Sequence, residues 1–192
     1  DRLIMGALTS FILGIGMTVT AAYIFLAIVL VPALTNSGIN PLASHMFVMY
    51  WGMLSFITPP VALAAFAAAS VANVAPMRAG FEAMRLGAII YFVPFFFVFN
   101  PALLLQGSII ENLQAFTTAI FGVAIVSGAL QGYMIGVGDL GSGIKGLVIK
   151  ILVGMSGLML ALPAGGLFGF SQIALLAVAV GLLVSGIVAR KV

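Results

Sequence analysis

The feature that most constrains this chain is a pair of adjacent prolines inside a long apolar run, Leu42 to Asn73, which contains no Asp, Glu, Lys or Arg. A continuous helix over this run would be about 48 Å long, against about 30 Å for the hydrocarbon core of a bilayer. Pro59 and Pro60 have no backbone N–H and clash with the turn before them. The sequence therefore predicts that one helix ends near Thr58 and that another starts at Pro60.

The composition places the chain in a membrane. Of its 192 residues 64% are hydrophobic and 6% are charged, and the mean hydropathy is +1.33. A soluble domain with so little charge would expose a mostly apolar surface. We expect an all-α polytopic membrane protein with about six hydrophobic segments. The formal charge of +3 then reports orientation in the membrane, and no nucleic acid is expected as a partner.

A second long apolar run, Leu3 to Leu34, is also too long for one untilted span. Its interruption is predicted at Gly14–Thr20, where two glycines and β-branched residues lower the helix propensity. The two long runs thus predict two discontinuous helices or re-entrant hairpins. At membrane depth, irregular backbone of this kind is tolerated only where it is buried in protein or lines a cavity.

The rest of the chain divides into a short linker and ordinary spans. A short interfacial helix is expected at 75–85, in which Glu82 would pair with Arg78 at i,i+4 spacing. The expected organisation is part of a transport domain at 1–74, the linker at 75–85, two spans at 86–138 and two spans at 139–192. The spans themselves are predicted at Leu86–Leu105, Leu113–Ile135, Ile144–Pro163 and Ser171–Val188, with Gly132 and Gly136 in a small-xxx-small packing pattern and an uncharged turn at 164–170.

The basic residues predict the orientation. Six of them fall in loops or ends on the same side of this arrangement, namely Arg78, Arg85, Lys145, Lys150, Arg190 and Lys191. By the positive-inside rule that side is the cytoplasm, so the C-terminus is expected to be cytoplasmic.

Several motifs carry no chemistry in this setting. The segment Gly136–Gly141 matches G-x-G-x-x-G, but it ends a predicted span and is interpreted as a turn. His45 is the only histidine and there is no cysteine, so no metal centre of three or four protein ligands is expected. The chain has neither G-x-S-x-G nor H-E-x-x-H, and no enzyme activity is predicted.

The polar groups at the two interruptions are the candidate site. All four acids, Asp1, Glu82, Glu111 and Asp139, lie at span ends or in loops, so no carboxylate is buried at mid-membrane. Hydroxyls and freed carbonyls remain, and such hard oxygen ligands suit Na⁺. Alternatively, the hydroxyls only bond to i−4 carbonyls and ease the kinks. The residues proposed for ion or substrate binding are Gly14, Gly16, Thr18, Thr20, Ser55, Thr58, Pro59 and Pro60, with Na⁺ at Ser55 and Thr58.

Four blocks of sequence occur in the order of a known family. They are Gly14–Tyr23, His45–Val48, Ser55–Ala64 and Phe95–Leu104. Together they resemble the large membrane subunit of TRAP transporters, which are ATP-independent uptake systems with a periplasmic solute-binding protein. The last block is similar to the branch in which the small and large subunits are fused, a branch that works with the TAXI type of binding protein. The resemblance covers roughly residues 3 to 135.

The resemblance implies a secondary transporter that imports small organic acids with a cation gradient, Na⁺ or else H⁺, and no other cofactor. It also implies a scaffold and an elevator-type transport domain with broken helices, in the cytoplasmic (inner) membrane of a bacterium or archaeon. The expected partners are a TAXI-type binding protein, the remaining part of the permease and the lipid bilayer, since the chain is expected to be the C-terminal part of a longer permease. The alternative is a membrane scaffold or assembly subunit that does not transport and whose kinks serve only packing.

Overall fold

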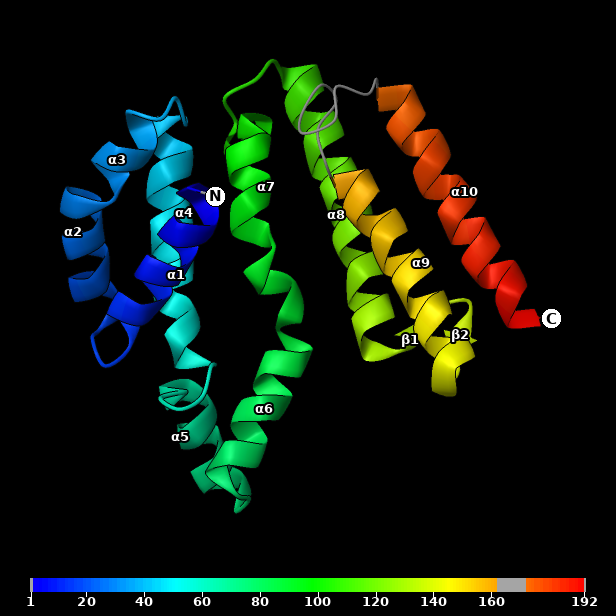
Figure 1. Cartoon of the computed structure of the whole chain (residues 1–192), viewed down its shortest axis with the longest axis horizontal. Coiled ribbons are helices and arrows are strands. Elements are labelled where there is room, and N and C mark those ends of the chain that lie inside the picture. The colour runs from blue at the N-terminus through cyan, green and yellow to red at the C-terminus, as the bar shows by residue number, and fades with distance from the viewer. Residues whose placement is uncertain (1, 162–171, 192) are drawn as a thin grey trace. The chain divides into compact units, whose positions relative to one another are not determined.

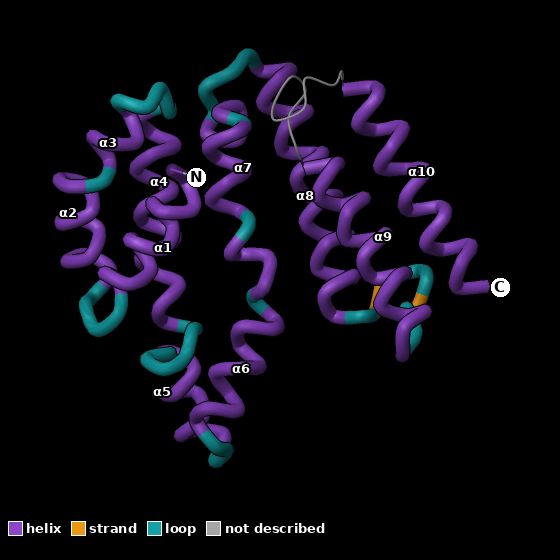
Figure 2. The backbone as a smooth tube through the Cα atoms, viewed as in Figure 1, coloured by secondary structure: helices purple, strands orange, loops and turns teal. Residues whose placement is uncertain are grey.

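The computed structural model describes residues 2–161 and 172–191, and the chain divides into two compact units after Pro101. Both units are built from helices (Figures 1 and 2). The strands that the structure describes are two short ones of two residues each, in the second unit. The expected all-α class is therefore correct for nearly the whole described chain.

The first unit is organised around α4. Its helices are α1 (Arg2–Gly14), α2 (Val19–Val29), α3 (Val31–Thr35), α4 (Pro41–Met53), α5 (Leu63–Ala72), α6 (Pro76–Leu86) and α7 (Val93–Phe99). Helix α4 packs against α1, α2, α3 and α7 (Figure 1). The core of this unit contains the fully buried side chains of Leu26, Phe47 and Val48. Because α4 is apolar on all sides, it is covered by other helices rather than exposed along one face.

Both predicted interruptions are present, but the second has different limits. Helix α1 ends at Gly14 and α2 begins at Val19, within the predicted interval. Helix α4 ends at Met53, and a 3₁₀ turn, η1, covers Leu54–Phe56. The next helix starts at Leu63, so the predicted restart at Pro60 is wrong. The reason is that Ala62 is left-handed with φ 38°, which excludes it from a right-handed helix.

The predicted linker forms α6, and the predicted span after it is bent. A 3₁₀ turn, η2 (Ala88–Tyr91), separates α6 from α7, and the two parts meet at an angle of 66°. The predicted span at Leu86–Leu105 is irregular: it contains η2, α7 and a further 3₁₀ turn, η3 (Pro101–Leu104). Gly87 and Pro94 account for the irregularity, since glycine favours helix ends and proline removes a helical donor. Glu82 pairs with Arg85 and not with Arg78 as predicted, at 2.9 Å.

The second unit contains a tightly packed helix pair. Its elements are α8 (Ile109–Gln131), β1 (Tyr133–Met134), β2 (Gly138–Asp139), α9 (Gly143–Ala161) and α10 (Gln172–Lys191). Gly122 of α8 and Gly157 of α9 face each other so closely that a Cβ on either would lie 2.7 Å from the other's carbonyl oxygen. Such contacts are how small residues bring membrane helices together.

The glycine-rich segment between α8 and α9 is a turn, as predicted. The two strands form an antiparallel pair in which Tyr133 opposes Asp139. Gly132 and Gly136 have φ of 75° and 84°, so they shape this hairpin. The prediction that these two glycines pack helices is wrong, because both lie beyond the end of α8.

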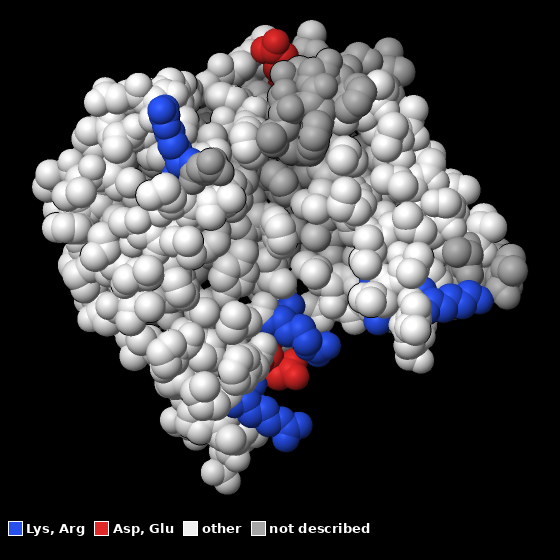
Figure 3. Space-filling model, viewed as in Figure 1, with Lys and Arg blue, Asp and Glu red and all other residues white. Residues whose placement is uncertain are grey.

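Two described helices, α8 and α9, are long and apolar enough to cross a membrane, and the bent α6–α7 pair would make a third. Large apolar side chains are exposed over them, among them Ile109 at 86% and Ile144 at 85%. On the face shown in Figure 3, charged side chains form a few small groups on an otherwise uncharged surface. These findings agree with an integral membrane protein. The count of six segments and the inside orientation remain predictions, and the predicted turn at 164–170 lies outside the described residues.

Candidate functional site

The two interruptions meet through a hydrogen bond. The Ser55 hydroxyl, which is 2% exposed, lies 2.9 Å from the carbonyl oxygen of Gly14 and 3.1 Å from that of Gly52. Gly14 is the last residue of α1, and Ser55 lies at the start of the second interruption. The close approach depends on glycine, because a Cβ on Gly14 would overlap the Gly52 carbonyl group. The first and second apolar runs are thus joined where both stop being helical.

Thr58 lies in the second interruption and has two hydroxyl contacts. Its Oγ1 donates to the carbonyl oxygen of Leu54 at 2.7 Å, four residues earlier, and lies 2.6 Å from the hydroxyl of Tyr91. Thr58 is 7% exposed. The bond to Leu54 is the i−4 pattern that hydroxyl residues use to ease a bend. The contact with Tyr91 connects the interruption to the bend between α6 and α7.

The backbone of the second interruption closes on itself. The Ala62 N–H donates to the carbonyl oxygens of Ser55 and Thr58, both at 3.1 Å. The bond to Ser55 satisfies a carbonyl whose helical partner would be Pro59, which has no N–H, and the bond to Thr58 has ordinary i−4 spacing. Helix α5 then begins without a side-chain cap, so the N–H groups of its first turn have no side-chain acceptor among the described residues. A helix N-terminus of this kind carries a partial positive charge.

The structure brings together only part of the predicted residue set. Gly14 and Ser55 meet where α1 ends beside η1, Thr58 follows in the same interruption, and Pro59 packs against Gly80 of α6. The other four, Gly16, Thr18, Thr20 and Pro60, are exposed.

The exposed residues of the first interruption have local roles. Thr18 caps α2 by accepting from the N–H of Ala21 at 3.3 Å. Gly16 has φ 80° and a Cβ there would meet nothing within 4 Å, so this glycine supplies turn geometry. The hydroxyl of Thr20 has no hydrogen-bond partner within the described part of the chain. Within this unit, the second interruption is therefore the better candidate for a binding site.

Aromatic side chains pack between the last turns of α4 and the η2–α7 segment, next to the second interruption. The Trp51 ring contacts those of Tyr91 and Phe95, with ring centroids 6.0 and 5.9 Å apart. Phe47 completes the group by packing edge-on to Phe95 at 5.4 Å. Phe95 of α7 therefore serves packing here.

Sequence reasoning missed two residues of this site, Gly52 and Tyr91. Gly52 lies within an ordinary helical stretch, and only the position of α1 shows why a close approach occurs there. Tyr91 gives a weak signal, because it is the one hydroxyl-bearing residue in the apolar stretch Leu86–Phe99. A hydroxyl at membrane depth needs a hydrogen-bond partner. That rule flags Tyr91 but does not identify Thr58 as the partner.

His45 is half-buried and contacts a neighbouring helix. Its Nδ1 lies 3.0 Å from the hydroxyl of Tyr23, which joins α4 to α2. Among the described residues, no group of three or more His, Cys, Asp or Glu side chains lies close enough to hold a metal ion.

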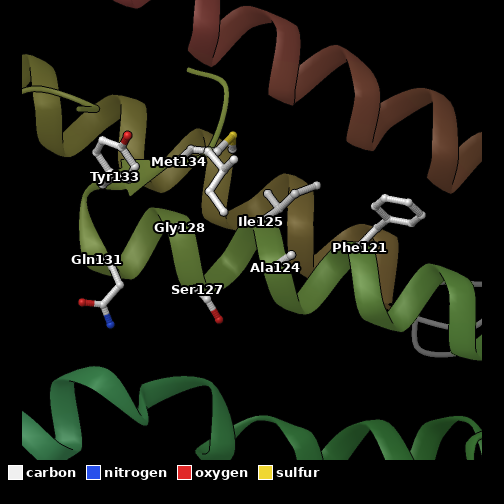
Figure 4. A pocket seen from close by; sticks show the side chains of 9 residues that line it. Phe121, Ala124, Ile125, Ser127, Gly128, Gln131, Tyr133 and Met134 are labelled. Carbon is white, nitrogen blue, oxygen red and sulfur yellow. The ribbon is translucent and has the colours of Figure 1, made fainter. Parts of the chain in front are cut away.

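The second unit has a separate cavity of about 520 Å³ along α8. Figure 4 shows Phe121, Ala124 and Ile125 on α8 and Tyr133 and Met134 from β1 around it. Its lining is mainly apolar, and none of the predicted site residues belongs to it. It is therefore distinct from the polar groups of the second interruption.

The comparisons with known proteins identify a family. The family model described as "Tripartite ATP-independent periplasmic transporter, DctM component" matches residues 2–112. No curated protein matches the chain. No solved structure matches it either. The matched region contains both interruptions, the bent α6–α7 pair and the start of α8, and it covers more than half of the chain. The chain therefore belongs to the DctM family, the TRAP transporter large component.

Proposed function

We propose that this chain is part of a TRAP permease that imports small organic acids with a cation gradient, and that Na⁺ is the coupling ion. The partners would be a periplasmic solute-binding protein of the TAXI type, the other parts of the permease and the bilayer of a bacterial or archaeal cytoplasmic membrane. Family membership supports a transport component rather than an enzyme. The observation that carries the proposal is the hydrogen bond between Ser55 and Gly14, which unites two interrupted helices.

The coupling ion is assigned to the second interruption because oxygen atoms gather there. The Ser55 hydroxyl contacts the carbonyl oxygens of Gly14 and Gly52. Three residues later, the Thr58 hydroxyl contacts the carbonyl oxygen of Leu54. Unwound backbone carbonyls and hydroxyls of this kind coordinate cations in secondary transporters. Each hydroxyl oxygen keeps lone pairs after donating its proton, so donation to a carbonyl does not prevent it from binding a cation.

The substrate is assigned to the helix that follows. Helix α5 starts directly after the interruption and has no side-chain cap. Its free N–H groups and partial positive charge favour a carboxylate. An organic acid bound there would lie beside the proposed cation, which would offset its charge.

One observation favours the alternative of a scaffold or assembly subunit that does not transport. Both buried hydroxyls already donate to backbone carbonyls, and this is how Ser and Thr stabilise simple kinks. Under that alternative the interruption would be needed for packing and not for transport.

The deciding experiment is uptake by the complete parent permease with its binding protein in proteoliposomes. Labelled succinate, malate and glutarate serve as probes under an inward Na⁺ gradient, for the wild type and for Ser55→Ala combined with Thr58→Val. Ser44→Ala is the matched control, because Ser44 is also buried in α4 and donates to a backbone carbonyl, that of Asn40 at 3.0 Å.

We expect Na⁺-dependent uptake in the wild type and in Ser44→Ala. In the double variant the Na⁺ concentration for half-maximal uptake should rise about tenfold or more, because a bond to a charged group is worth about 1.5–3 kcal/mol. Na⁺-driven uptake that survives the double substitution unchanged would make the interruption a structural kink. Uptake whose rate does not depend on the Na⁺ gradient would refute Na⁺ coupling, and a proton gradient would then be applied. The absence of uptake under either gradient would favour the scaffold.

A further inference from the structure

Tyr91 occupies a position between two parts of the first unit. It lies in η2, at the bend between α6 and α7. Its hydroxyl is 2.6 Å from Thr58 Oγ1, and its ring contacts Trp51 edge-on. Sequence patterns assign no role to this residue. Its hydroxyl reaches one of the two side chains that the proposed cation site depends on.

The direction of this hydrogen bond follows from counting protons. A threonine hydroxyl has one proton and two lone pairs. A carbonyl oxygen only accepts, so the 2.7 Å contact between Thr58 and Leu54 uses the Thr58 proton. The 2.6 Å contact with Tyr91 must then use the Tyr91 proton and one Thr58 lone pair. One lone pair of Thr58 Oγ1 remains, and the two bonds fix its direction.

Two further contacts join the bent helix pair to the same interruption. A Cβ on Gly80 of α6 would lie 2.7 Å from Cγ of Pro59. A Cβ on Gly87 would lie 3.1 Å from Cδ1 of Ile57. Gly80 and Gly87 therefore pack against two side chains of the interruption. Tyr91 adds a directed hydrogen bond to these apolar contacts.

We infer that Tyr91 is a positioning residue for the proposed cation site, because its hydroxyl holds Thr58 Oγ1 with one lone pair free for the coupling ion. This inference rests on the proposed function. A fixed donor group costs less conformational entropy when a ligand binds. Without the Tyr91 hydroxyl, the second lone pair of Thr58 would be solvated or unpaired and its hydroxyl would rotate more freely. Loss of this hydroxyl should therefore weaken cation binding without removing a ligand.

The test uses the chain in lipid nanodiscs and NaCl as the probe, with KCl keeping the ionic strength constant. Trp51 is the only tryptophan of the chain and contacts the Tyr91 ring, so its fluorescence reports on the site. The variants are Tyr91→Phe, Thr58→Val and the double variant. Tyr50→Phe is the matched control, because Tyr50 packs on Phe97 at 5.2 Å but its hydroxyl has no partner in the described part of the chain.

The midpoint of the Na⁺ titration should rise about three- to tenfold in Tyr91→Phe and remain at the wild-type value in Tyr50→Phe. Thr58→Val should raise the midpoint more strongly. Adding Tyr91→Phe to that variant should change it less than twofold, because Tyr91 acts through Thr58. A wild-type midpoint in Tyr91→Phe, or equal shifts from the two tyrosine variants, would overturn the inference.

A second measurement separates this inference from the proposed function. Hydrogen–deuterium exchange is followed in the peptide covering residues 54–62, whose Ala62 N–H is bonded to Ser55 and Thr58. Exchange should be faster in Tyr91→Phe than in the wild type and Tyr50→Phe. If the wild type shows no Na⁺ response, Na⁺ coupling fails, and this exchange result decides whether Tyr91 positions the interruption. Unchanged exchange in Tyr91→Phe would then refute that role.

Discussion

The contact between Gly14 and Gly52 provides the sharpest test of how the two interruptions are joined. In the sequence these glycines look alike, since each lies at or near the end of an apolar helix. Their surroundings differ. A Cβ on Gly14 would overlap the carbonyl group of Gly52, which is backbone and cannot rotate away. A Cβ on Gly52 would meet Cδ1 of Leu26 at 3.5 Å, which is an ordinary van der Waals distance.

Two effects determine the cost of Gly14→Ala. Forcing extra volume into a packed contact typically costs about 1–3 kcal/mol. Moving α1 away from α4 would also weaken the 2.9 Å bond from Ser55 to the Gly14 carbonyl, worth about 1 kcal/mol. The expected loss in the free energy of unfolding is therefore about 2–4 kcal/mol. Gly52→Ala should lie within about 1 kcal/mol of the wild type, because alanine also favours the helix.

The assay is unfolding by sodium dodecyl sulfate in mixed micelles, followed by helical circular dichroism. The wild type, Gly14→Ala and Gly52→Ala are compared at one lipid-to-detergent ratio. A third comparison repeats Gly14→Ala in a Ser55→Ala background. There the penalty should shrink by about 1 kcal/mol, since the hydrogen bond has already been removed.

Equal penalties for the two alanine substitutions would refute the reasoning, because they would show that the steric difference between the two glycines does not exist in the membrane. A second outcome would refute a different step of the reasoning, namely a Gly14→Ala penalty that is the same with and without the Ser55 hydroxyl. It would mean that the clash acts without disturbing the hydrogen bond, so the two interruptions would not move as one unit.

Two further predictions concern other parts of the chain. Gly157→Ala should lower the free energy of unfolding by about 1–3 kcal/mol in the same assay, because its Cβ would lie 2.7 Å from the Gly122 carbonyl oxygen. Gly154→Ala is the control and should be nearly neutral. Equal effects of the two substitutions would contradict this close helix crossing. Glu82→Gln should change the unfolding free energy by less than about 0.5 kcal/mol, because both side chains of the pair with Arg85 are more than half exposed. A larger loss would mean that this pair is shielded from water.

The sequence predicted the existence of both interruptions because their causes are local. Adjacent prolines cannot continue a helix, and the glycines near residue 14 weaken one. Local rules do not set where the next helix starts. Ala62 is left-handed and donates to the carbonyls of Ser55 and Thr58, which lie several residues earlier. The propensity of alanine for helices predicts the opposite, so the start at Leu63 could not be read from the sequence.

Of the candidate site, the sequence likewise indicated only the residues that local rules select. Ser55 and Thr58 could be selected, since polar side chains at a break in an apolar run need partners. Their partners, Gly14 and Tyr91, lie 41 and 33 residues away in the chain. No periodicity or motif carries information over such a distance. Thr18 was selected by the same rule but proved to be a helix cap. Residue types thus identify the candidates, while the packing of α1 and of the α6–α7 bend selects among them.

Backbone contacts and hydroxyl hydrogen bonds around the second interruption would have different roles in the proposed transport cycle. The contact of Gly14 with Gly52 is between backbones, so it cannot change unless whole helices move. The hydroxyl bonds of Ser55 and Thr58 are worth only about 1 kcal/mol each, and the proposed cation would replace or strengthen them. A cation that binds one arrangement better than another shifts the equilibrium only by that difference in binding energy. Substitutions at Gly14 should therefore act mainly on stability, whereas substitutions at Tyr91 should act mainly on the cation midpoint. If both positions changed both quantities equally, the backbone contact and the hydroxyl bonds would form one cooperative unit, and the interruption could not rearrange without unpacking α1 from α4.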